Sequence, residues 1–189
     1  MSKSVLSLEE LIQYQASIAD NSSAAEFMNQ KMISTTLYIA GIGDQLIGLG
    51  QMIDGNTKPK VGITNFPSAN VLPAGVNALV TEARMLFGTV TAGQTPVSSD
   101  WKATAPKEWL NADLTFTQGG ISFSTPISDL HNFKASTGND DDFRSIIPFK
   151  IREQVAFNFV TELAGTSAST VAWRLELRAV LYTDKAAVK

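Results

Sequence analysis

The clearest pattern in the chain is a strict alternation of apolar and polar positions over residues 170–183. A period of two is typical of a β-strand with one buried face, because successive side chains point to opposite sides of a sheet. The polar face carries Arg174, Glu176 and Arg178, whose opposite charges can attract one another. The apolar face consists of Val171, Trp173, Leu175, Leu177, Ala179 and Leu181. A strand of this length needs neighbouring strands and a second layer to bury that face.

Similar patterns predict further strands along the chain. They fall within 33–53, 77–91, 110–116, 121–125, 143–151 and 154–163. Pro148 interrupts one of them and cannot donate to a ladder, so that strand is expected at an edge or at a bulge. Gln118-Gly119-Gly120 predicts a hairpin turn of three residues. Two long polar segments, 54–75 and 92–107, are expected to be loops.

Most links between these strands are short, and helix-length crossovers are missing, which favours antiparallel pairing over a parallel α/β sheet. About eight strands are expected, and they fit a two-sheet sandwich or a barrel. The length of 189 residues and an apolar fraction of 44% suit one such domain, over 33–189.

The first part of the chain has a different periodicity. Residues 1–32 are expected to form a short amphipathic helical arm, either two helices or one with a break at 21–23. Ser23 and Glu26 have the spacing of a capping box that opens an apolar face with Phe27 and Met28. We expect this arm to pack on the main domain or on a neighbouring subunit. A membrane-surface helix is the alternative, but few early cations are present to attract anionic lipid.

Composition excludes several function classes. The chain has no cysteine, so disulfides, thiolate metal sites and cysteine nucleophiles are ruled out. A net charge of -3 argues against a nucleic-acid binder that works through bulk positive charge. No apolar run is long enough to predict a spanning helix. The N-terminal segment lacks the layout of a signal peptide, so we expect no Sec export.

Catalytic chemistry is not expected. His131 is the only histidine, and no nucleophile elbow accompanies it and its neighbour Asp129, so a surface or helix-capping role is predicted. Asp113, Glu162 and Glu176 lie on polar strand faces, where solvated or cross-strand paired carboxylates are expected rather than a glycosidase pair. We therefore predict that the protein is not an enzyme.

One loop and one tryptophan are candidates for binding. Asp140, Asp141 and Asp142 supply hard oxygen ligands suited to Ca²⁺, although EF-hand spacing is lacking and a solvated acidic turn is favoured. No other cofactor is predicted. Trp101 lies in a polar loop and is expected to be either a lid on the core or an interface anchor. Trp109 opens a predicted strand, and its exposure stays ambiguous.

Three stretches carry a resemblance to a known family. They are EWLNADLTFTQGGISFSTPISDL, DFRSIIPFKIREQVAFNFVTEL and STVAWRLELRAVLYT. Over residues 77–183, their order of hairpin, short connection and late strands resembles viral single jelly-roll capsid proteins (coat or penton) of the tailless icosahedral phage type. The resemblance implies a jelly roll of two four-stranded sheets in a virion subunit. Its loops and arm would contact other copies or other capsid proteins in a shell assembled in the host cytoplasm.

The arm departs from one pattern in that group. Many RNA-virus coats carry a basic arm, whereas this arm is acidic to neutral. We therefore expect no direct contact with nucleic acid, and we expect the arm to lie near an inner membrane. Interface candidates are Trp101, Arg174, Glu176, Arg178, Phe27 and Met28. The alternative is a carbohydrate-binding, lectin-like β-sandwich that uses Ca²⁺ at residues 140–142.

Overall fold

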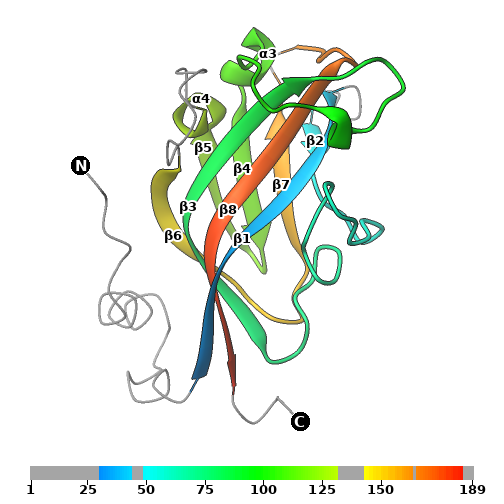
Figure 1. The fold of residues 1–189 in the computed structure, drawn as a ribbon. Coiled ribbons are helices and arrows are strands. Elements are labelled where there is room, and N and C mark those ends of the chain that lie inside the picture. Colours follow the sequence, from blue (N-terminus) through cyan, green and yellow to red (C-terminus); the bar gives the residue numbers. More distant parts are fainter. Residues whose placement is uncertain (1–29, 44–48, 132–142, 164, 185–189) are drawn as a thin grey trace, which may run out of the picture.

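The protein is mainly β and forms two antiparallel sheets packed face to face (Figure 1). The structure, a computed structural model, describes residues 30–43, 49–131, 143–163 and 165–184. The predicted β-sandwich of about eight strands is confirmed. The first sheet has the order β1-β8-β3-β6 and the second has the order β2-β7-β4-β5.

The strands of the first sheet are long. They are β1 (Gln30–Ile42), β3 (Val76–Thr89), β6 (Arg144–Ile151) and β8 (Val171–Asp184). Those of the second sheet are shorter, namely β2 (Leu49–Gln51), β4 (Asp113–Gln118), β5 (Ile121–Pro126) and β7 (Phe157–Glu162). The pairings β1·β8, β2·β7, β3·β6 and β4·β5 are nested inside one another along the sequence. Two more pairings, β3·β8 and β4·β7, join these pairs into sheets.

The strand at the C-terminal end is the centre of the first sheet, as its alternation predicted. β8 lies between β1 and β3 and pairs with both over nearly its whole length. Trp173, Leu175 and Leu177 are buried in the core between the sheets. Pro148 lies in β6, which is an edge strand, and the register between β3 and β6 shifts near this position. The predicted edge placement of Pro148 is therefore confirmed.

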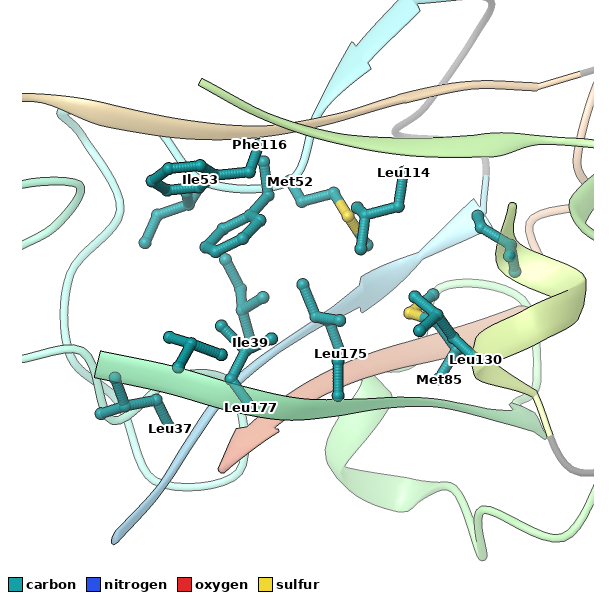
Figure 2. Packing of buried hydrophobic residues seen from close by; sticks show 14 of the residues in the cluster. Leu37, Ile39, Met52, Ile53, Met85, Leu114, Phe116, Leu130, Leu175 and Leu177 are labelled. Carbon is teal, nitrogen blue, oxygen red and sulfur yellow. The ribbon is translucent and has the colours of Figure 1, made fainter. Parts of the chain in front are cut away.

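Both sheets contribute to one apolar core. Leu37, Ile39, Leu175 and Leu177 of the first sheet face Phe116 and its neighbours from the opposite layer (Figure 2). The ring centroids of Phe116 on β4 and Phe149 on β6 are 4.3 Å apart, so aromatic packing connects the two sheets on the side of β5 and β6. Burial of this apolar surface is the main force that holds the layers together.

The described helices are short: η2 (Pro96–Ser98), α3 (Lys107–Leu110) and α4 (Ile127–Leu130). The prediction that a strand begins at residue 110 was wrong, because Lys107–Leu110 form a helical turn and β4 begins at Asp113. Pro106 starts that turn, and its carbonyl accepts hydrogen bonds from the N–H groups of Trp109 and Leu110. Trp109 is fully buried, and its Nε1 donates to the Ser167 hydroxyl at 2.8 Å, so it is no exposed platform. Among the described helices, none combines the length and apolar character that crossing a membrane requires.

The hairpin between β4 and β5 has a two-residue turn instead of the predicted three. Gln118 pairs with Ile121, which leaves Gly119 and Gly120 as the turn. Their φ angles of +56° and +83° belong to the left-handed region, which glycine adopts without steric cost.

The boundary of the predicted arm also changes. β1 begins at Gln30, so residues 30–32, predicted as the end of a helical arm, are strand. The remainder of the predicted arm, with Phe27 and Met28, lies outside the described residues. Met32 pairs with Tyr182 of β8, and this long-range pairing overrides the local helical spacing.

His131 is buried, contrary to the surface position predicted as one of its two roles, whereas the capping alternative is confirmed: it is the C-cap of α4, and its N–H donates to the Ile127 carbonyl at 3.0 Å. It is 6% exposed and its ring meets Phe87 edge-on, with 5.3 Å between centroids. The Ala105 N–H donates to Nε2 at 3.2 Å, so Nδ1 carries the proton and faces the Met85 carbonyl at 3.3 Å. The histidine thus connects α4 to β3 and to the loop before α3.

Candidate interaction surface

The polar face of β8 forms a charged row on the outer side of the first sheet. Antiparallel pairing places Glu82 and Arg84 of β3 opposite Arg178 and Glu176 of β8. Arg178 Nη1 lies 2.9 Å from Glu82 Oε2. Arg174, two residues before Glu176 on the same face, completes the row with an ion pair of 2.7 Å to Glu176. The predicted attraction between same-face neighbours on this strand is confirmed, and we call these five residues the charged row.

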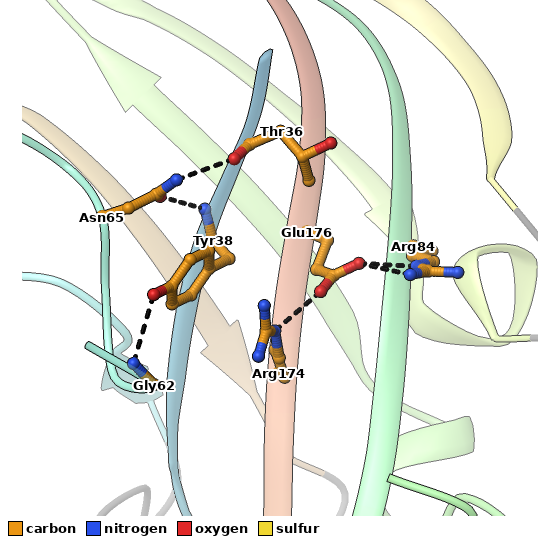
Figure 3. Close-up of polar contacts among 7 residues, drawn as sticks. All are labelled: Thr36, Tyr38, Gly62, Asn65, Arg84, Arg174 and Glu176. Carbon is orange, nitrogen blue, oxygen red and sulfur yellow. Dashed lines mark hydrogen bonds and ion pairs between the residues drawn. The ribbon is translucent and has the colours of Figure 1, made fainter. Parts of the chain in front are cut away.

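Glu176 is the centre of the charged row and is 6% exposed. Arg84 contacts its Oε2 through Nη2 at 2.6 Å and donates to it from Nε at 2.7 Å, while Arg174 contacts Oε1 (Figure 3). Both oxygens of the carboxylate are therefore occupied by guanidinium groups. Three arginines against two glutamates give the row a net charge of +1.

Aromatic rings cover the arginines of the charged row. The Arg174 guanidinium lies 4.0 Å from the centroid of the Tyr38 ring and 5.8 Å from that of Trp101. Arg84 and Arg178 lie 4.4 Å and 4.2 Å from the centroid of Phe143. Cation–π contacts of this kind contribute about 0.5–1 kcal/mol each at exposed sites. The row is thus held in one geometry before any partner arrives.

Trp101 faces this outer surface and is not a lid on the core between the sheets. The preceding loop lies directly against β3 because residue 88 is a glycine. A Cβ on Gly88 would come within 1.6 Å of the Ser99 hydroxyl oxygen. Ser99 in turn accepts a hydrogen bond from the Trp101 N–H at 3.3 Å. The half-buried tryptophan is therefore placed beside the charged row by the backbone of its own loop.

A second loop borders the same surface along the edge of β1. Asn65 accepts from the Tyr38 N–H at 2.7 Å and donates to the Thr36 carbonyl at 2.8 Å (Figure 3). The Tyr38 hydroxyl accepts from the Gly62 N–H at 3.2 Å. These bonds fix the segment that carries Val61, which is 90% exposed.

Val61 has an apolar neighbour on the next loop. Val97 is 52% exposed, and a Cβ on Gly62 would lie 2.9 Å from Val97 Cγ2. The two loops are thus in contact beside the charged row. We call Val61 and Val97 the valine pair.

These features support binding better than catalysis. The Glu176 carboxylate is occupied on both oxygens, so it is not presented to a substrate. An open hollow in the loop between β3 and Trp101 is lined by Thr89, Val90, Thr91, Gln94 and Ser98, none of them a general acid or base at neutral pH. Preorganised charge and apolar side chains on fixed loops are common at protein interfaces.

The other predicted candidates fall elsewhere. Asp113 and Glu162 are exposed and lie opposite each other on β4 and β7 of the second sheet, whereas Glu176 lies on β8 of the first sheet. Among the described residues no group of three or more His, Asp or Glu could hold a metal ion. Asp140, Asp141 and Asp142 lie outside the described residues, so the Ca²⁺ prediction stays a prediction.

Sequence reasoning placed Trp101, Arg174, Glu176 and Arg178 among the interface candidates, and all four lie on this one surface. It missed Tyr38, Arg84 and Phe143, which join the surface only through strand pairing and loop placement. The alternation of residues 77–91 places Glu82 and Arg84 on the polar face of that strand, but a local pattern cannot identify the residues that they pair with.

No protein-family model matches the chain, and no curated protein matches its sequence. The geometry and the residues therefore carry the functional argument.

Proposed function

We propose that this protein is a structural, self-assembling subunit of a virion shell, built through loop and arm contacts. The observation that carries the proposal is the nested pairing of the strands. β1·β8, β2·β7, β3·β6 and β4·β5 pair like one long hairpin folded over on itself into two four-stranded sheets. This is the order of the jelly roll, a fold that recurs in viral capsid domains and in lectins.

The surface of the first sheet supports assembly as the use of this fold. The charged row is partly buried and already paired, so little conformational entropy is lost when a partner covers it. The valine pair adds exposed apolar surface at its border. The partners are other copies of the chain or other capsid proteins, in a particle of the tailless icosahedral phage type that is assembled in the host cytoplasm. An acidic-to-neutral arm favours proximity to an inner membrane over direct contact with the genome.

A lectin-like module is the second candidate, because lectins share the jelly roll and because Tyr38 and Trp101 lie at the surface. Sugars stack on the faces of such rings. Here the Arg174 guanidinium already lies over both rings, which favours the assembly proposal. Binding on a glycan array that disappears with EDTA would support a Ca²⁺-dependent lectin instead.

Light scattering on a size-exclusion column, followed by negative-stain microscopy, tests the proposal. The expected result is a concentration-dependent rise in mass and the appearance of closed or ring-shaped particles. A protein that stays strictly monomeric at high concentration, alone and with candidate capsid partners, would overturn it.

A truncation separates the roles of the arm and the sandwich. Because β1 begins at Gln30, the deletion removes residues 1–29 only. Assembly should weaken while the thermal unfolding of the sandwich is retained. Loss of folding in the truncated chain would show that the arm belongs to the core.

A further inference from the structure

Among the residues that the structure describes, the first half of β1 has no neighbour on one side and is an open sheet edge. β1 is the outermost strand of the first sheet on its side, and β8 covers its other side. Between Thr36 and Ala40 the free side is closed by hydrogen bonds to Ile63 and Asn65. From 30 to 35, the described part of the chain places no strand or loop bond on that side. Figure 1 shows this part of β1 running with the end of β8 past the second sheet.

The parity of the loop bonds identifies the backbone groups on the open edge. The groups bound by the loop belong to Thr36, Tyr38 and Ala40, which are even-numbered positions. The β1·β8 register is continuous over the whole strand, so this parity persists toward residue 30. Met32 and Ser34 therefore direct their N–H and C=O groups away from β8 and toward any additional strand.

The other sheet edges offer less. β6 carries Pro148 and a register shift, and both are devices that protect an edge. β2 has three residues. On β5 the hairpin register directs the backbone N–H and C=O groups of Ser122 and Ser124 away from β4. Pro126, which has no N–H, follows at the next such position. The first half of β1 is the longest edge without such protection in the described chain.

We infer that two copies of this chain pair through the first halves of their β1 strands, antiparallel about a twofold axis. Met32 of each copy exchanges hydrogen bonds with Ser34 of the other, and Ile33 faces Ile33 across the axis. An antiparallel edge is self-complementary, which is the condition for a twofold contact. The choice of a second copy as the occupant rests on the proposed function, and the pairing gives that function one defined contact.

The side chains fit this register. Ile33 has the parity of buried Leu37 but is 49% exposed, because the second sheet does not extend over it. Facing Ile33 of the second copy removes apolar surface from water on both sides. Lys31 lies opposite Thr35 in this register, so the two lysines do not face each other. From Thr36 onward the edge is occupied by the loop that carries Ile63 and Asn65, so the pairing is limited to about six residues of each strand.

Cysteine crosslinking tests the pairing, because the chain has no cysteine of its own. Residues facing each other in a non-hydrogen-bonded antiparallel pair have Cα atoms about 4.5 Å apart, within the range that a disulfide spans. Ile33→Cys should give a disulfide-linked dimer in high yield under mild oxidation of the assembled protein. Ile147→Cys is the matched control, since Ile147 is 81% exposed but lies on the protected β6 edge. Its dimer yield should be at least tenfold lower.

The substitution Ser34→Pro provides a second test of the pairing. Because the Ser34 N–H points away from β8, proline removes a bond between copies and none within the β1·β8 ladder. In the Ile33→Cys background it should lower crosslinking at least tenfold with little change in the melting temperature.

The outcomes separate the two proposals. Shell assembly without an Ile33→Cys dimer, or with a dimer that Ser34→Pro leaves unchanged, overturns the β1 contact and spares the proposed function. A strictly monomeric protein that forms no crosslink overturns both.

Discussion

At the scale of single residues, Glu176 is the position on which the outer surface depends. It accepts ion pairs from Arg84 and Arg174 while being nearly excluded from water. If Arg174, Glu176 and Arg178 were all solvated, charge reversal on this face of β8 would affect assembly and leave the fold intact. Glu176 is buried, so changing it should also lower stability, because removing one partner of a buried ion network leaves the other charges uncompensated.

Glu176→Gln should lower the free energy of unfolding by about 2–3 kcal/mol, because it leaves two partly buried guanidinium groups without their carboxylate. Glu82→Gln is the control. Glu82 and its partner Arg178 are 23% and 37% exposed, and a pair of this exposure contributes about 1 kcal/mol or less. Urea unfolding of both variants measures the difference. Equal losses would show that burial of Glu176 has no energetic role.

Tyr182 gives the protein a pH dependence in the alkaline range. Burial is the main cause that raises the pKa of Tyr182 far above its ordinary value of 10.0. The folded protein therefore keeps the phenol neutral while the unfolded chain ionises it. Its stabilising contribution is complete below pH 10 and is lost as the pH rises further, by up to about 1.4 kcal/mol per pH unit.

Tyr182→Phe should flatten this alkaline loss of stability, measured by urea unfolding from pH 9 to about 11.5. Burial lowers the pKa of neighbouring Lys150, whose deprotonation acts in the opposite direction and is present in both proteins. The difference between the two proteins therefore isolates the phenol. Identical slopes would mean that Tyr182 ionises freely in the folded state.

At the scale of elements, alternation predicted strands more reliably than their limits. The strand at 170–183, the hairpin after residue 112 and the edge position of Pro148 all follow from local pattern and from proline chemistry. Trp109 was ambiguous because a single helical turn before a strand leaves no periodicity to detect. The burial of His131 was missed because the partners of its ring nitrogens come from residues 26 and 46 positions away, whereas its capping role follows from local sequence.

Pairing between strands was beyond local pattern for the same reason. Arg84 and Glu176 are 92 residues apart, and their contact depends on β3 lying beside β8. The polar parity of each strand could be read from the sequence, whereas the identity of the neighbour could not.

The β4–β5 hairpin is connected to the β6–β7 loop by one buried side chain. Gln118 is 5% exposed; it donates to the carbonyls of Arg152 and Val155 and accepts from the Arg152 N–H. Gln118→Met keeps the volume and removes these bonds, so we expect a loss of about 2–3 kcal/mol. Proteolysis within 152–156 should also become faster.

Thr117→Val serves as the control for this substitution. Thr117 is the half-exposed neighbour on the opposite face of the strand, and the change should fall within about 0.5 kcal/mol. Limited proteolysis and urea unfolding measure both effects. Unchanged cleavage in Gln118→Met would show that the loop is held by other contacts.

At the scale of the whole molecule, the proposed function predicts that apolar groups on fixed loops act between molecules. Val61→Asp should therefore weaken assembly at least tenfold while the melting temperature stays within a few degrees, since the side chain is 90% exposed. Light scattering over a concentration series measures the first quantity and circular dichroism the second. Ser122→Asp makes the same charge change at an exposed position of β5 and controls for charge alone. Equal effects of the two substitutions would argue against a specific contact at Val61.

The pairing of β1 with β8 also has a consequence for engineering. Gln30 lies directly opposite Asp184, so the two ends of the described sandwich are about 5 Å apart, the spacing of neighbouring strands. Peptides fused before residue 30 and after residue 184 would emerge from the same end of the domain. A short linker could join these positions, and new termini could be opened in the exposed turn around Gly93, which follows the opposite end of β3 at Thr89. A display scaffold built this way could move its cargo from one end of the sandwich to the other without altering a strand.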